Sequence, residues 1–167
     1  MANERPKLKI VSGGQTGADR AALDVALALG LPVGGWCPKG RRAEDGVIPD
    51  RYPLVEIPER DYQVRTRRNV EGSDGTLILN LGALEGGTAL TVKLAREVVG
   101  KPCRVVALEK GIDPANFRAW LETQWIAALN VAGPRESKRP GVYAAAVRCL
   151  EELLREPPPS RPPADSR

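Results

Sequence analysis

The chain has 167 residues, of which 42% are hydrophobic and 28% are charged, proportions ordinary for a globular protein. It has no histidine, which excludes His-dependent catalytic triads, His general bases and His metal sites. Its three cysteines are far apart and odd in number, which argues against a disulfide framework and a thiolate zinc site. Without a long apolar run or an apolar signal segment, we expect a cytoplasmic protein that does not enter a membrane.

Apolar runs alternate with helical patterns along the chain. The run GTLILN, residues 75–80, is continuous and predicts a strand buried on both faces. Prolines and glycines between residues 37 and 53 predict a long irregular loop, which in a compact domain is usually functional or mobile. In chain order, we expect strands at 7–11, 31–36, 54–57, 75–80, 103–109 and 129–133, and helices at 18–29, 62–71, 88–99, from Asp113 onward, and at 142–155.

This alternation predicts an α/β fold, a Rossmann-like three-layer sandwich with a mostly parallel sheet. We expect residues 1–156 to form one domain and the proline-rich segment 157–167 to be disordered. Phe117, Trp120 and Trp125 recur at helical spacing and indicate a face that packs in the core or against a second copy. We therefore expect a homo-oligomer, with the helix that carries the two tryptophans as the candidate interface.

Three expected loops each follow a strand and precede a helix, at residues 12–17, 80–88 and 133–140. In a parallel sheet the loops after the strand C-termini lie along one edge, and ligands bind at that edge. The sequence therefore predicts that the three loops meet there. A net charge of +4 suggests an anionic partner.

The first loop, SGGQTGAD, joins the first strand to the first helix. Glycines at such a junction let backbone N–H groups approach a phosphate, and the helix dipole favours negative charge. The alternative is a tight crossover in which the glycines supply positive φ. A P-loop is excluded because GxxxxGK[ST] is absent, and Ser12 replaces the first glycine of a dinucleotide fingerprint. The candidate ligand residues of this loop are Gly13, Gly14, Gln15, Thr16, Gly17 and Asp19.

The other two loops carry further candidates. Gly86, Gly87 and Thr88 begin a helix, which again favours an anion, and Glu85 beside them is the carboxylate candidate for acid–base catalysis. In GPRES, Arg135 can fork onto a phosphate or carboxylate, and Glu136 can bind a hydroxyl or an amine. A solvated polar loop is the alternative in both cases. Asn80, Arg65 and Asn69 complete the set of ligand candidates, and Cys37 is a possible nucleophile at a strand end.

Five ordered motifs together resemble the putative molybdenum carrier family, also described as circularly permuted YpsA-like proteins. These motifs are SGGQTGADRAALDVA, GWCPKGRRAEDG, NVEGSDGTLIL, GGTALT and NVAGPRES, within about residues 8 to 155. The resemblance implies a Rossmann-like fold related to the LOG-type (lysine-decarboxylase-like) nucleotide phosphoribohydrolases and to DNA-processing protein A. It also implies a nucleotide, or the phosphate-bearing molybdenum cofactor, bound at two glycine loops.

The LOG-type relatives permit a comparison residue by residue. Their Arg-Lys-x-x-Met motif falls on residues 65–69, where Arg65 is kept, and their PGGxGTxxE motif falls on residues 80–91. Gly87 and Thr88 match this second motif, but Thr91 stands where the resemblance implies a catalytic glutamate. This replacement argues against hydrolysis of an N-glycosidic bond. If hydrolysis does occur, Glu85 is the candidate acid in place of the missing glutamate.

We therefore expect a carrier-like protein that binds a phosphorylated nucleotide- or pterin-like ligand and has no protein-bound metal site. The alternative is a nucleoside-monophosphate phosphoribohydrolase of the LOG type. A nucleic-acid-binding protein ranks third, because the few aromatic residues make stacking on single strands unfavourable. The sequence leaves open which ligand binds, whether the ligand is turned over, and what the loop 37–53 does.

Overall fold

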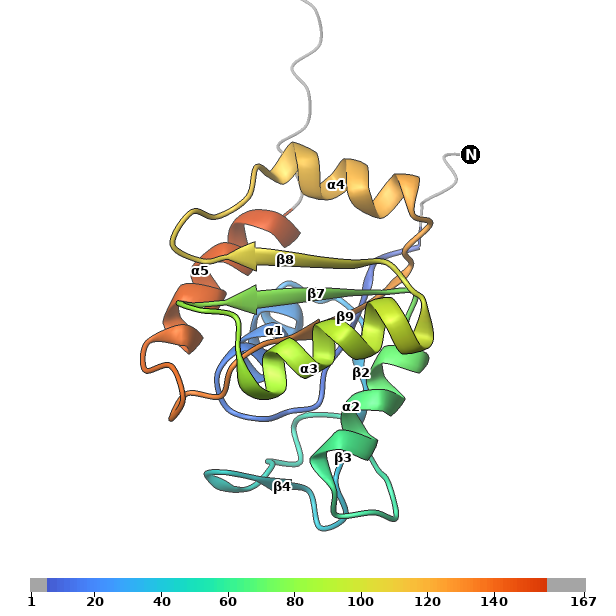
Figure 1. Cartoon of the computed structure of the whole chain (residues 1–167), viewed down its shortest axis with the longest axis vertical. Helices are drawn as coiled ribbons and strands as arrows, with labels where there is room; N and C mark the ends of the chain where they lie inside the picture. Colours follow the sequence, from blue (N-terminus) through green and yellow to red (C-terminus); the bar gives the residue numbers. More distant parts are fainter. Residues whose placement is uncertain (1–5, 156–167) are drawn as a thin grey trace, which may run out of the picture.

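The computed structural model describes residues 6–155, and these residues build a five-stranded parallel sheet between helices (Figure 1). This arrangement is the α/β, Rossmann-like fold that the sequence predicts. The expected disorder of 157–167 and the domain boundary at 156 lie outside the described residues. The spatial order of the strands is β2 (Val33–Gly34), β1 (Lys9–Val11), β9 (Ala128–Ala132), β7 (Gly75–Asn80) and β8 (Cys103–Ala107).

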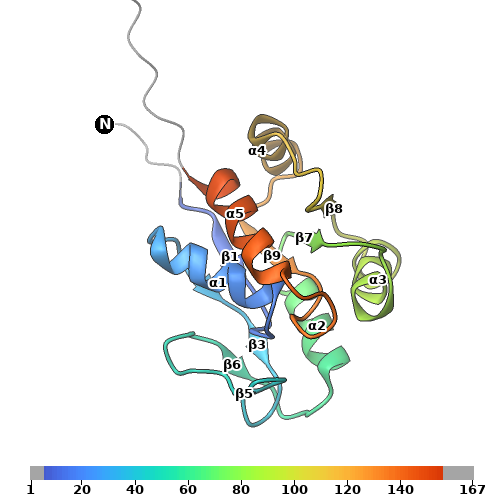
Figure 2. The ribbon, with the colours of Figure 1, turned by 90° about the vertical axis from the view of Figure 1, so that its left-hand side faces the viewer.

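Helices cover both faces of this sheet. On one face, α1 (Ala18–Ala28), α4 (Pro114–Thr123) and α5 (Val142–Leu154) pack with the strands in one apolar cluster. Figure 2 shows α2 (Tyr62–Glu71) and α3 (Gly86–Lys93) on the other side of the sheet from α4 and α5. A π-helix, η1 (Leu94–Val99), continues α3, so the single helix expected at 88–99 changes its winding halfway along.

The strand β7 positions polar groups on the side of α2 and α3. All six of its residues are buried, which confirms the prediction for residues 75–80. Leu77 and Leu79 join the apolar cluster of α1 and α5, so the alternation of a strand turns Thr76 and Asn80 to the opposite face. The amide of Asn130 on β9 donates to the Thr76 hydroxyl at 3.3 Å. Polar side chains therefore lie beneath α2 and α3.

The strand expected at 31–36 divides at Gly35. The two-residue β2 joins the main sheet, whereas β3 (Trp36–Cys37) pairs in parallel with β6 (Val55–Glu56) in a separate sheet. Gly35 has a φ of 135°, and a Cβ there would lie 2.1 Å from the Ser12 carbonyl oxygen. The close passage of these two backbones therefore requires glycine and redirects the chain.

Residues 37–53 form a packed structure where the sequence predicts an irregular loop. The segment contains an antiparallel hairpin of β4 (Arg42–Ala43) and β5 (Gly46–Val47). Arg41 holds the segment together, because its guanidinium donates to four backbone carbonyls at 2.9 to 3.1 Å. Beneath it lies a second apolar cluster of Leu23, Cys37, Ile48, Tyr52 and Leu54.

Two expectations about the far edge of the sheet need correction. The strand expected at 103–109 ends at Ala107, and as the edge strand β8 it leaves most of its residues partly exposed, although its apolar run suggests burial. The helix α4 begins as predicted, with the Asp113 side chain accepting from the Ala115 N–H at 2.8 Å, but it ends at Thr123. Trp125 then adopts a φ of 56° with 88% exposure, so it does not share the buried helix face of Phe117.

Candidate functional site

The three predicted loops converge at the C-terminal ends of β1, β7 and β9. Together with α2 and α3 they border an open cleft of about 1150 Å³. The convergence expected from the strand order is therefore present. The predicted residues that line the cleft are Gly13, Gln15, Asp19, Arg65, Asn69, Asn80, Glu85, Gly86, Gly87, Thr88 and Arg135.

Arg65 is the most informative side chain of the cleft. It projects from α2, whose first turn is capped by Asp61 accepting from the Gln63 N–H at 2.8 Å. Its Nη1 lies 3.1 Å from Asp19 Oδ2, and only 9% of the residue is exposed. The buried Nε has no hydrogen-bond partner among the described residues. A buried donor of this kind costs free energy unless a ligand or water accepts from it.

Gly13 makes room for this arginine. A Cβ on Gly13 would lie 1.8 Å from Arg65 Nη1 and 2.7 Å from Arg65 Cζ. The guanidinium therefore lies directly against the backbone of the first glycine loop. Burial raises the pKa of the Asp19 carboxyl above its usual value, and the charge of Arg65 opposes that rise. The pair thus places a fixed cation on the floor of the cleft.

Tyr62 and Arg135 form the neighbouring part of the cleft. The Tyr62 ring has three guanidinium groups, those of Arg42, Arg65 and Arg135, at 5.5 to 6.0 Å from its centroid. Within residues 6–155, no carboxylate lies within ion-pair distance of Arg135. The cationic side chains of the lining are Arg65, Arg67, Lys93, Arg135, Lys138 and Arg139, and the acidic ones are Asp19, Asp61 and Glu85. Positive charge therefore predominates.

Four predicted ligand residues, Gly14, Thr16, Gly17 and Glu136, do not belong to the cleft lining. Gly14 and Gly17 have φ of 75° and 81°, which is the conformational role that the alternative interpretation gave them. A Cβ on Gly17 would also lie 2.3 Å from the Pro134 carbonyl oxygen. Both glycines therefore allow the first loop to pass close to its neighbours.

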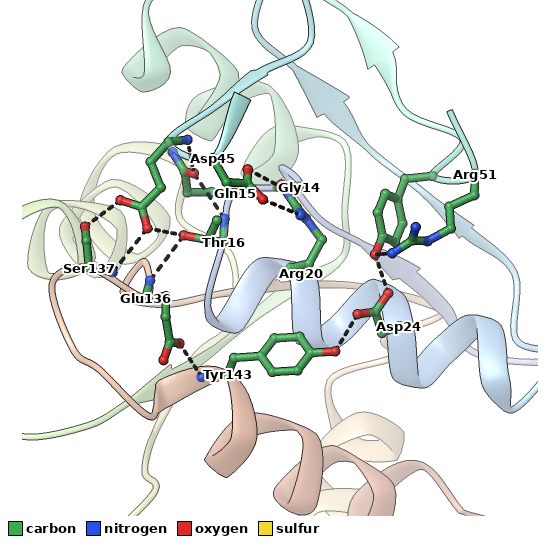
Figure 3. Close-up of polar contacts among 12 residues, drawn as sticks. Gly14, Gln15, Thr16, Arg20, Asp24, Asp45, Arg51, Glu136, Ser137 and Tyr143 are labelled. Carbon is green, nitrogen blue, oxygen red and sulfur yellow. Dashed lines mark hydrogen bonds and ion pairs between the residues drawn. The ribbon is translucent and has the colours of Figure 1, made fainter. Parts of the chain in front are cut away.

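Thr16 and Glu136 connect loops to each other (Figure 3). The Thr16 hydroxyl accepts from the Glu136 N–H at 3.2 Å and donates to the Glu44 carboxylate. The Glu136 carboxylate accepts from the backbone N–H groups of Gly141 at 2.6 Å and Tyr143 at 2.9 Å, at the start of α5. Their polar atoms thus have partners within the protein.

Asn69 and Asn80 line the cleft while serving the fold. The Asn69 amide accepts from the Trp36 N–H and donates to the Trp36 carbonyl, both at 2.9 Å, so it holds β3 against α2. The Asn80 amide donates to the Gly82 carbonyl at 3.0 Å and so fixes the turn of the second loop. Both side chains therefore shape the cleft by positioning its backbone.

The candidates for catalysis have other partners. Glu85 is exposed and forms an ion pair with Arg139. The Thr91 hydroxyl donates to the Gly87 carbonyl at 2.9 Å, within its own helix. Cys37 is fully buried, and burial raises the pKa of its thiol, which disfavours the nucleophilic thiolate.

Sequence reasoning missed several residues of this region, among them Asn130, Arg139 and Glu44. Asn130 lines the cleft from inside the apolar strand β9, and a polar residue in a buried run is the signal that could have found it. Arg139 lines the cleft and lies in the basic segment 134–139. Glu44 lies in the segment 37–53, and no local pattern predicts its contact with Thr16, because only the fold brings the two together.

A parallel sheet between helices, with glycine-rich loops meeting at one edge, places this protein in the class of Rossmann-like α/β proteins. The chain belongs to the circularly permutated YpsA SLOG family, whose model matches residues 10–154. It is similar to the crystal structure of a putative molybdenum carrier protein from Syntrophus aciditrophicus SB, with 46% sequence identity and a TM-score of 0.83. The alignment covers 93% of this chain and 100% of the other. None of the curated proteins compared with the chain matches it.

These findings confirm the family resemblance seen in the five motifs. Two further observations concern residues 6–155 alone. No helix there is both long and apolar enough to cross a membrane. No group of three or more His, Cys, Asp or Glu side chains in this range could hold a metal ion.

Proposed function

We propose that the cleft binds and carries a phosphate-bearing small molecule of nucleotide or pterin type, with the molybdenum cofactor as one candidate cargo. The observation that carries this proposal is the cationic lining of the cleft, in which Arg65, with a buried Nε that has no partner among the described residues, and Arg135 share the ring of Tyr62. The similarity to a putative molybdenum carrier protein supports the choice of cargo.

The residues of the cleft suit the phosphate end of such a ligand. Arg65 is held in place by Asp19 and supplies one positive charge, while Arg135 supplies a second. The α3 N-terminus, at Gly86 and Gly87, adds backbone N–H groups and the positive end of a helix dipole. A hydrogen bond between charged partners contributes about 1.5 to 3 kcal/mol, so losing one contact weakens binding about tenfold or more.

The test is a calorimetric titration of the full chain with pyrophosphate, AMP, ADP-ribose and molybdopterin. We expect at least one of these anions to bind, and Arg135→Gln to weaken that binding about tenfold. The double variant Arg65→Gln with Asp19→Asn removes both partners of the buried ion pair, so that neither charge is left unpaired. We expect it to weaken anion binding more than Arg135→Gln does. The matched control is Arg118→Gln, an exposed arginine on α4 outside the cleft lining.

The proposal fails if none of the four anions binds at millimolar concentration, or if Arg118→Gln weakens binding as much as Arg135→Gln does. Release of free base from AMP during the same titration would show turnover. That outcome would favour the phosphoribohydrolase function over the carrier function.

A further inference from the structure

One wall of the cleft is apolar. Leu90, Leu94 and Val98 recur every four residues along α3 and η1 and line the cleft, and Val64 of α2 also lines it. Leu90 is 56% exposed, Val98 58% and Val64 39%. We call these four residues the apolar wall. Figures 1 and 2 both show α2 and α3 on the same side of the sheet, where the wall lies.

The gathering of these side chains is unusual within the described part of the chain. The other large hydrophobic residues that are exposed lie on separate elements, such as Leu27 on α1 and Val47 on β5. Scattered exposed residues need no explanation, whereas a contiguous apolar surface marks a binding site. Here that surface and the cationic groups Arg65 and Arg135 border the same cleft.

Two threonine hydroxyls near the wall are already engaged as donors. The Thr91 hydroxyl donates to the Gly87 carbonyl at 2.9 Å, and the Thr66 hydroxyl donates to the Tyr62 carbonyl at 2.8 Å. Both bonds stay within the helix that carries the threonine. The wall itself consists of Leu and Val side chains, so it offers apolar contact area and no donors or acceptors that could read the edge of a heterocycle.

The winding of the helix is a second independent feature of this wall. Leu94 and Val98 belong to the π-helix η1, and π-helical turns are rare and frequently lie at functional sites. The change from α3 to η1 occurs where the helix borders the cleft.

We propose that the ligand has two parts which the cleft binds separately, a phosphate and a flat apolar body. Resting on the proposed phosphate-binding function, this inference places the phosphate at Arg65 and Arg135 and the body against the apolar wall. Recognition of the body follows its apolar area and not the hydrogen-bonding pattern of a particular base. The preferred ligand class is a phosphate monoester of an aromatic group.

The experiment measures the affinity of the full chain for inorganic phosphate, ribose 5-phosphate, phenyl phosphate and 1-naphthyl phosphate. Each buried methylene-sized group tightens binding about fourfold, so we expect affinity to rise from phosphate to phenyl to naphthyl phosphate. Ribose 5-phosphate, whose body is polar, is expected to bind no more tightly than inorganic phosphate.

Two variants locate the effect. Leu90→Gln and Val98→Gln are each expected to weaken 1-naphthyl phosphate binding about tenfold and to leave inorganic phosphate binding unchanged. Because more than half of each side chain is exposed, the fold should tolerate both changes. Leu27→Gln and Val47→Gln are matched controls outside the cleft lining, and both should leave every affinity unchanged.

The inference is overturned if ribose 5-phosphate binds as tightly as 1-naphthyl phosphate, or if the wall variants leave naphthyl phosphate binding unaltered. It is also overturned if sedimentation shows a dimer that Leu90→Gln dissociates without changing that binding, since a second copy would then cover the wall. Phosphate binding without any gain from the aromatic body removes this inference alone. If no phosphate compound binds at all, the proposed function fails with it.

Discussion

At the scale of single residues, Gly13 and Arg65 depend on each other. The sequence suggests that Gly13 lets a backbone N–H approach a phosphate, and the structure adds that its missing Cβ is the space that Arg65 occupies. Asp19, 4% exposed, holds Arg65 from the first turn of α1. The absence of a Cβ on Gly13 therefore leaves space for the Arg65 guanidinium on the floor of the cleft.

Gly13→Ala should displace Arg65, because the new methyl group would lie 1.8 Å from Nη1. Overpacking of this kind costs about 1 to 3 kcal/mol, and we expect a loss of that size in the free energy of unfolding by urea. Pyrophosphate binding should weaken at the same time. Gly87→Ala is the control for stability alone, since a Cβ there meets nothing within 4 Å. Equal stability of the two variants would contradict the prediction.

At the scale of elements, the two acidic residues at the tip of the β4–β5 hairpin fasten it to the first glycine loop and to α1. The Glu44 carboxylate accepts from the Thr16 hydroxyl and from the Ser137 N–H at 3.1 Å. Asp45 forms an ion pair with Arg20 of α1 at 3.0 Å. Figure 3 shows Asp45, Arg20, Thr16 and Ser137 around this junction. The hairpin thus joins the first and third loops of the cleft.

Both acidic groups should make the hairpin sensitive to acid. Desolvation raises the pKa of Glu44, but hydrogen bonds from Ser137 and Thr16 outweigh this and leave it below its ordinary value of 4.5. The Arg20 side chain lowers the pKa of Asp45 below 3.8. Groups with depressed pKa values stabilise the folded state above their ordinary pKa, and this stabilisation disappears as the pH falls through the lowered values.

We therefore expect protection of the amides of residues 42–47 against hydrogen exchange to be constant down to about pH 4.5 and to decrease below it. Protection factors are normalised for intrinsic exchange, and β7 in the core serves as the internal reference. The double change Glu44→Gln with Asp45→Asn should lower protection at neutral pH and remove the acid dependence. Unchanged acid dependence in this double variant would refute the assignment.

At the scale of the whole molecule, Asp24 joins three parts of the fold. Its carboxylate, on α1, accepts from the hydroxyl of Tyr52 in the segment 37–53 and from that of Tyr143 on α5 at 2.6 Å (Figure 3). Arg51 donates to the Tyr52 hydroxyl at 2.7 Å. The hydrogen bond to Asp24 and partial burial raise the pKa of Tyr143 to about 12. This cluster couples the segment beside the cleft to the main core.

Asp24→Asn should weaken this coupling, because an amide cannot accept from two phenols with both of its polar atoms. We expect the free energy of unfolding by urea to fall by about 1 to 3 kcal/mol. A spectrophotometric titration should show the pKa of Tyr143 falling from about 12 toward its ordinary value of 10. Asp50→Asn, an exposed change in the same segment, is the control. An unchanged tyrosine titration would contradict the role of Asp24.

The sequence by itself determined the fold class and the edge at which the cleft forms. A continuous, β-rich apolar run such as 75–80 is typical of a strand buried on both faces of a sheet, and glycine-rich stretches at 12–17 and 80–88 follow two of the strands. Because parallel strands end at one edge, this local pattern was enough to bring Arg135 and the two glycine loops together. The helix expected at 62–71 also agrees with α2 in both bounds.

Only the tertiary structure decided what each polar side chain does at that edge. Thr16 and Glu136 carry the same donors and acceptors as any ligand-binding residues, yet both are engaged within the protein. The Thr16 hydroxyl contacts residues distant in sequence, and the Glu136 carboxylate accepts from N–H groups at the start of α5. Arg65 lies against the first loop because Gly13, distant in sequence, leaves space for its guanidinium. The backbone conformation of Gly35 likewise depends on its close passage by Ser12. Local sequence encodes periodicity, whereas these contacts arise only when distant segments pack.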